Sequence, residues 1–137
     1  MKKLAVLITS GAYNRLLQAL EFAGVAAQHG VQVSALFRDE AASRMTKDKV
    51  RDIPFSEAYR GRETRVKNLL KEQQRHDLAA LMREMKERGD VKLSICRDSL
   101  AYFDITVDQI IPEIDEVQGL DAFWKEEVGM ADQVVAF

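Results

Sequence analysis

The sequence predicts an α/β protein, a three-layer α/β/α sandwich around a mainly parallel sheet of about five strands. Short continuous apolar runs, typical of strands buried on both faces, alternate with longer amphipathic segments. The first strand, helix and strand follow one another with tight joints, as in a right-handed βαβ unit. The same alternation continues to the last residues, and this is the pattern of layered parallel sheets.

The first βαβ unit covers residues 4–37. Residues 4–8 form an apolar run that ends in a Thr-Ser-Gly turn, which predicts a buried strand. Apolar side chains then recur at intervals of four, three and four residues, which predicts a helix over 13–29. Asn14 is a candidate cap near its start, and Gly30 suits the left-handed position after its end. Residues 31–37 predict the second strand.

Residues 41–75 form a basic excursion between the second strand and the next helix. They carry ten Lys or Arg against five acids, whereas residues 76–137 carry six basic and fourteen acidic side chains. A charge run of this kind is usually a solvated face, but it also suits a basic rim for an anionic ligand or acidic partner. The segment lacks nucleic-acid-binding motifs and interleaved aromatics, so we expect no nucleic-acid partner. Pro54 and Gly61 interrupt it, and residues 63–70 follow a helical pattern.

The second half of the chain continues the alternation of helices and strands. Apolar periodicity over 78–88 predicts a helix, with Asp77 as its N-cap. The remaining expected elements are a strand at 91–96, a short helix near 99–103, a weak strand near 114–117, a helix near 120–130 and a last strand at 133–137. We interpret the acids Glu113, Asp115 and Glu116 as an exposed sheet edge rather than a catalytic carboxylate cluster.

Composition excludes several classes of function. The chain has one cysteine, so it can form no internal disulfide or multi-cysteine metal site, and neither histidine lies at metal-ligand spacing from it. We therefore expect no metal and no cofactor, and the chain has no P-loop or G-x-G-x-x-G motif. No apolar run is long enough to cross a bilayer, and no cleavage site follows the first one. We expect one domain over 1–137, in the cytoplasm, with a free thiol.

Cys96 is the residue with most chemistry to offer, because it ends a predicted strand just before a predicted helix. Ligands of open α/β sheets gather at the carboxyl ends of strands. Backbone N–H groups of the helix start and the Arg97 guanidinium would favour a thiolate there, whereas Asp98 would disfavour it. The residues alone leave a second interpretation open, in which Cys96 is a small buried hydrophobe.

The order and spacing of these elements resemble the DsrE/DsrF-like (DsrEFH-like) family of small sulfur-relay proteins, in particular its stand-alone branch that carries the peroxiredoxin name. The matching residues extend over nearly the whole chain outside 41–75. They are Ser10, Gly11 and Tyr13 after the first strand, Leu17, Leu20, Ala23, Gly30 and Leu36-Phe37, then Gly89, Val91, Cys96, Ser99 and Ile105, and finally Val117, Gly119, Phe123 and the strand from Ala131 to Phe137.

This resemblance implies a flavodoxin-like domain that forms homo-oligomers and carries a persulfide or thiosulfonate on the matched cysteine, Cys96. Sulfur donor and acceptor proteins, or small sulfur anions such as thiosulfate, would be its partners. Around the sulfur we expect Ser10, Gly11, Arg38, Arg97 and Ser99 to stabilise the thiolate or hold an anionic donor. With no second thiol, the chain suits partner-dependent sulfur transfer better than self-resolving disulfide chemistry.

Two other functions fit the same residues. One is a homo-oligomeric binding module without catalysis, in which Cys96 is structural. The other is a thiol peroxidase that needs an external resolving thiol. Whether sulfur transfer is also enzymatic turnover, as in a sulfurtransferase, stays open at this point.

Overall fold

A five-stranded sheet forms the centre of the molecule, and every neighbouring pair of strands in it is parallel. The computed structural model describes all residues, 1–137. The strands are β1 (Lys3–Ile8), β2 (Gln32–Phe37), β3 (Val91–Cys96), β4 (Glu116–Gln118) and β5 (Gln133–Ala136), in the spatial order β4-β3-β2-β1-β5. The predicted α/β fold with a sheet of about five strands is therefore confirmed.

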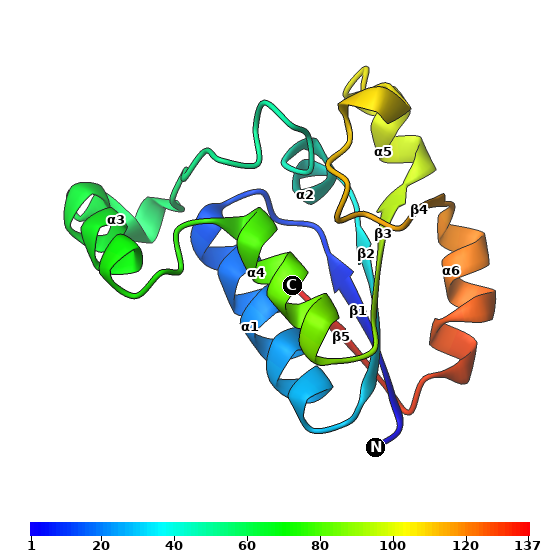
Figure 1. The fold of residues 1–137 in the computed structure, drawn as a ribbon. Helices are drawn as coiled ribbons and strands as arrows, with labels where there is room; N and C mark the ends of the chain where they lie inside the picture. Colours follow the sequence, from blue (N-terminus) through cyan, green and yellow to red (C-terminus); the bar gives the residue numbers. More distant parts are fainter.

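Helices cover both faces of this sheet (Figure 1). On one face lie α1 (Tyr13–Gln28) and α4 (Leu78–Arg88), which pack on each other and on the strands. The opposite face is covered by α6 (Leu120–Glu126), which is followed by the 3-10 turn η3 (Val128–Met130). No helix combines the length and the apolar character that a bilayer crossing requires.

Local signals explain where the helices begin and end. The Asp77 carboxylate accepts a hydrogen bond from the Ala80 N–H at 3.1 Å, which confirms the predicted N-cap of α4. Gly30 has φ +82°, the left-handed conformation expected after α1. The prediction that Asn14 caps α1 was wrong, because Ala12 occupies the N-cap position. The Asn14 side-chain amide instead exchanges two hydrogen bonds with Ser56.

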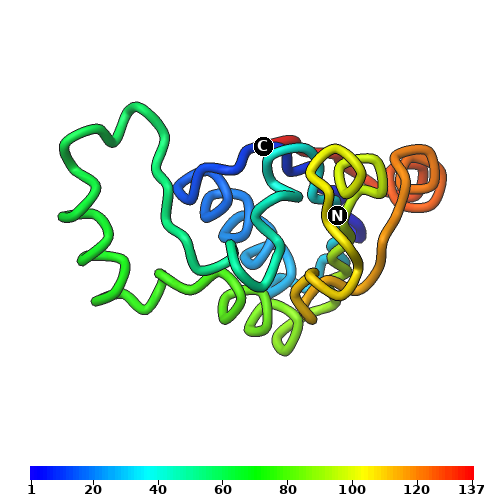
Figure 2. Tube along the Cα trace, turned by 90° about the horizontal axis from the view of Figure 1, so that it is seen from above, coloured from blue at the N-terminus to red at the C-terminus, as the bar shows by residue number.

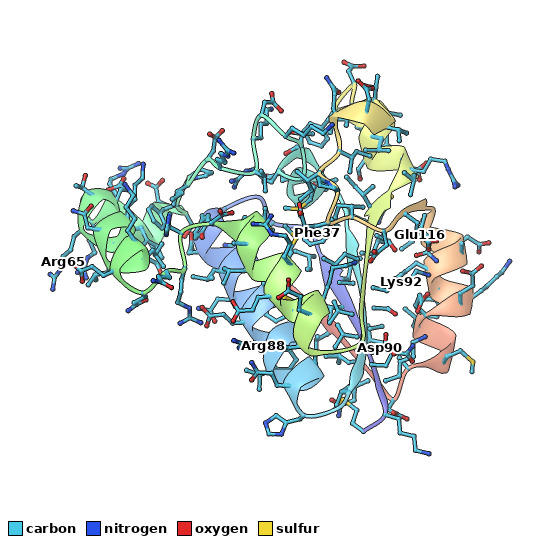
Figure 3. The ribbon with its side chains drawn as sticks, in the orientation of Figure 1. Phe37, Arg65, Arg88, Asp90, Lys92 and Glu116 are labelled. Carbon is cyan, nitrogen blue, oxygen red and sulfur yellow. The ribbon has the colours of Figure 1, made fainter.

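The basic excursion leaves the body of the molecule and returns to it. Its helix α3 (Glu63–Glu72) lies apart from the sheet, as Figures 1 and 2 show, after the short α2 (Glu40–Ser43) and the turn η1 (Glu57–Tyr59). Arg65 points outward on α3 (Figure 3). Buried Arg44 ties the root of the excursion to the β1 end by donating to the carbonyls of Gly11, Lys49 and Asp52.

The acidic residues before β4 differ from expectation. The strand begins at Glu116, later than predicted, and the carboxylates of this segment are paired with bases on the neighbouring elements. The pairs are Arg83 with Glu113, Lys86 with Asp115 and Lys92 with Glu116, and Asp115 also accepts from the Leu93 N–H at 2.8 Å. Glu113 is buried, so the interpretation as an exposed edge was wrong for that residue.

Candidate functional site

Cys96 lies where the sequence placed it, at the end of β3 and directly before α5 (Arg97–Tyr102). Its side chain is fully buried, with 0% exposure. It belongs to a small cluster with Ala5, Leu36 and Phe123, on the face of the sheet that α6 covers. The sulfur therefore sits at the carboxyl edge of the sheet but beneath other side chains.

Arg38 is the charged group in contact with this sulfur. It follows β2, the strand beside β3, and its Nε donates to Cys96 Sγ at 3.3 Å. Burial by itself raises the pKa of the Cys96 thiol. Hydrogen bonds from Arg38, from the backbone N–H groups of Ser99 and Asp98 and from the Ser99 hydroxyl outweigh burial, so the thiol pKa is lowered from its ordinary value.

A strained backbone residue completes this arrangement. Asp39 has φ +53° and ψ −130°, a backbone conformation that residues other than glycine rarely adopt. In it, the Asp39 N–H donates to Ser99 Oγ at 2.8 Å. Ser99 thus accepts from the residue after Arg38 while it donates to the sulfur, and it joins the ends of β2 and β3.

The structure brings together some of the residues named from the sequence but not all of them. Arg38 and Ser99 surround Cys96, whereas Ser10 and Gly11 follow β1, the strand beyond β2, and no hydrogen bond joins either of them to the sulfur. Gly11 lies against α2, where an added Cβ would meet Glu40 atoms at 3.1 Å. Arg97 is exposed, and its Nη1 would lie 3.3 Å from a Cβ added at Gly119.

Gln118 is a further residue of this site that sequence reasoning missed. It pairs in register with Cys96 across β3 and β4, so the two side chains lie side by side on one face. It is 4% exposed, its Nε2 donates to Glu126 Oε2 at 3.2 Å, and its Oε1 has no hydrogen-bond partner. A glutamine before a glycine carries no sequence signal for such a position, since only strand register brings it beside the sulfur.

On the same face lies an ionic network centred on the buried carboxylate of Glu127. The Glu127 carboxylate pairs with Lys3 at 2.8 Å and Lys92 at 3.0 Å, and it accepts from the Ser34 hydroxyl at 2.6 Å. Figure 3 shows Lys92 and Glu116 on the α6 side of the sheet. Burial alone raises the Glu127 pKa, but these partners outweigh it and lower the pKa to about 2. His, Cys, Asp and Glu side chains form no cluster of three that could hold a metal ion.

These features define an α/β protein with a single activated thiol at the carboxyl edge of a parallel sheet. The model of the DsrE/DsrF-like family matches residues 2–137, and the chain belongs to that family. Membership indicates a role of the sulfur-relay type.

The fold has a solved counterpart. A protein of unknown function from Methanobacterium thermoautotrophicum, MTH1491, superposes with a TM-score of 0.63 at 12% sequence identity, over 98% of this chain and 99% of that one. At this identity the likeness concerns the fold alone. No curated protein matches the chain.

Proposed function

We propose that this protein carries sulfane sulfur as a persulfide on Cys96 and passes it to a partner inside the cell. The observation that carries the proposal is the short contact between Arg38 Nε and Cys96 Sγ, 3.3 Å, in a set of hydrogen bonds that lowers the thiol pKa. Because the thiolate is the nucleophile in sulfur exchange, this environment prepares the residue for that chemistry.

Each half of the exchange balances without an oxidant. The Cys96 thiolate attacks the outer sulfur of a donor persulfide, the donor sulfur–sulfur bond breaks, and the donor leaves as a thiolate. With thiosulfate as donor, sulfite is the leaving group. An acceptor thiolate then attacks the terminal sulfur on Cys96, and the Cys96 thiolate is released. A partner must supply that second thiol, because the chain has only one cysteine.

Access to the sulfur requires movement of a covering side chain. Cys96 is fully buried. Arg38, which is partly buried, donates a hydrogen bond to its sulfur and makes no ion pair that would hold it there. We propose that an anionic donor draws the Arg38 guanidinium away and occupies its place, which exposes the sulfur while the positive charge stays nearby. Ser10, Gly11 and Arg97 remain proposed contacts of that donor at the same edge.

Sulfur loading tests the proposal directly. The native protein is treated with polysulfide or thiosulfate and its intact mass is recorded, beside Cys96→Ser. We expect the native chain to gain the mass of sulfur and the variant to gain none. Equal gain on both chains, or no gain on either, would remove the proposal.

Complete burial of Cys96 favours a second candidate, an oligomeric binding module with a structural cysteine. The two candidates differ in the rate of alkylation of the folded protein at neutral pH. Rapid labelling with an unchanged melting temperature of Cys96→Ser supports sulfur carriage. Labelling that occurs only on unfolding, with a destabilised variant, supports the binding module.

A further inference from the structure

We infer that Gln118 is a positioning residue for outgoing sulfur transfer: its unpartnered amide oxygen accepts a hydrogen bond from the terminal S–H of the Cys96 persulfide. This inference rests on the proposed function and adds to it the residue that controls the protonation of the carried sulfur.

Strand register places the amide beside the sulfur. Cys96 and Gln118 are paired residues of β3 and β4, and paired residues of parallel strands point to the same face about 5 Å apart. Both side chains are buried, Cys96 at 0% and Gln118 at 4% exposure. The α6 helix covers this face, and its Phe123 belongs to the same buried cluster as Cys96.

The orientation of the amide is fixed by its other end. Gln118 Nε2 donates to the Glu126 carboxylate at 3.2 Å, and a carboxylate can only accept, so the NH₂ group must face α6. The oxygen is thereby left inside, buried and without a donor. A buried acceptor without a partner is costly, and a donor that arrives during function removes this cost.

The terminal S–H of a persulfide is such a donor. A deprotonated terminal sulfur carries negative charge on the atom that the acceptor thiolate must attack, and like charges repel. Hydrogen bonding to the protonated form favours that form, so the amide oxygen keeps the terminal sulfur open to attack. When the acceptor sulfur bonds to it, the bond to Cys96 Sγ breaks, its electron pair stays on Sγ beside Arg38, and the terminal sulfur leaves with its proton.

Other charges around the sulfur act on the same equilibrium. The ionisable groups on the elements packed around Cys96 are Lys3 on β1, Arg38, Asp39 and Glu40 after β2, Lys92 on β3, Arg97, Asp98 and Tyr102 on α5, Glu116 on β4, and Asp121, Lys125, Glu126 and Glu127 on or just after α6. The test therefore compares variants in which none of these changes except Glu126.

The experiment follows sulfur release from the loaded protein. Native chain and Gln118→Met are loaded with polysulfide, the loaded fraction is measured by intact mass, and release to an aromatic thiolate that stays ionised is followed across pH. Rates are normalised to the loaded fraction. In the native chain, release falls at high pH as the terminal sulfur deprotonates. In Gln118→Met we expect about a fivefold loss of proton affinity at that sulfur, so the fall begins at lower pH.

The controls distinguish a failure of the role of Gln118 from a failure of sulfur carriage on Cys96. Gln133→Met, an exposed glutamine on β5, should keep the native profile. Glu126→Asp keeps the negative charge but draws the carboxylate back from Nε2, so the amide is free to turn. It should shift the profile in the same direction by less, which decides the matter if Gln118→Met does not fold. A native profile in both Gln118→Met and Glu126→Asp would overturn the role of Gln118 alone. A native chain that takes up no sulfur would overturn sulfur carriage and this inference with it.

Discussion

The two faces of the sheet differ in what covers them. The α1 and α4 face belongs to one continuous apolar cluster of twenty-six buried residues, which also extends to α2, α3 and α5. On the α6 face the apolar cluster has four buried members, one of which is Cys96, and the rest of the buried surface is occupied by the Glu127 ionic network and Gln118. Stability therefore resides mainly in the first face, and the groups capable of chemistry are concentrated on the second.

This contrast has a physical basis. A large apolar face gains free energy in proportion to the area removed from water, and each unpaired polar group buried in it costs free energy. A face built from paired charges gains little net stability, but it holds each charged group in a defined place. The α6 face is therefore suited to hold a thiol whose ionisation must be controlled.

Truncating one buried leucine on each face tests whether the two faces differ in their contribution to stability. Leu93 belongs to the large cluster and Leu36 to the small one, and both are 0% exposed. We expect Leu93→Ala to cost about 4 kcal/mol of unfolding free energy and Leu36→Ala about 2–3 kcal/mol, because fewer apolar contacts surround Leu36. Urea denaturation measures the loss of unfolding free energy in both variants, with Leu69→Ala at an exposed leucine as control. Equal losses at the two leucines would mean that the faces do not differ in this way.

Acid should weaken the α6 face selectively. The Glu127 pKa is lowered from 4.5 to about 2 in the folded protein, so its stabilising effect is complete above pH 4.5 and is lost as pH falls toward 2. A shift of this size corresponds to about 3 kcal/mol. Unfolding free energies of native protein and Glu127→Gln should therefore converge as pH falls through this range. Parallel curves with a constant gap would contradict a charged Glu127 at the centre of the network.

The reactivity of Cys96 should depend on Arg38. Removing the Nε–H···Sγ hydrogen bond in Arg38→Ala raises the thiol pKa, so the thiolate fraction at pH 7 should fall by about tenfold and the midpoint of the pH profile of alkylation should move to higher pH. The pH profile of alkylation corrects for access, since only its midpoint reports the pKa. Arg97→Ala is the matched control. A larger midpoint shift in Arg97→Ala than in Arg38→Ala would reassign the activating cation.

The smallest expected effect concerns the strain at Asp39. With φ +53°, this residue should be replaced favourably by glycine, which adopts positive φ at little cost. We expect Asp39→Gly to gain about 0.5–1 kcal/mol of stability, and Asp39→Ala to gain none, since alanine retains Cβ. Thermal unfolding compares the two. Similar stabilities would show that the carboxylate, and not the backbone, matters at this position.

Much of this arrangement was predictable because it is local. The start of α4 at Asp77, the end of α1 at Gly30 and the end of β3 at Cys96 depend on neighbouring residues in the chain. Arg38 and Ser99 were predicted because Arg38 follows the carboxyl end of β2 and Ser99 follows that of β3, and the carboxyl ends of parallel strands share one edge of the sheet. The pairing of Asn14 with Ser56, by contrast, joins residues 42 positions apart, and no local pattern indicates it.

By itself the sequence determined the layered α/β class and the position of its one thiol, and it named Arg38 and Arg97 as candidate neighbours without choosing between them. Periodicity and the common carboxyl edge of parallel strands require no tertiary detail. Tertiary structure alone decided that Cys96 is buried, that Gln118 lies beside it and that Ser10 and Gly11 stand one strand beyond Arg38. Strand order and register set these relations, and they are fixed by packing between segments far apart in the chain.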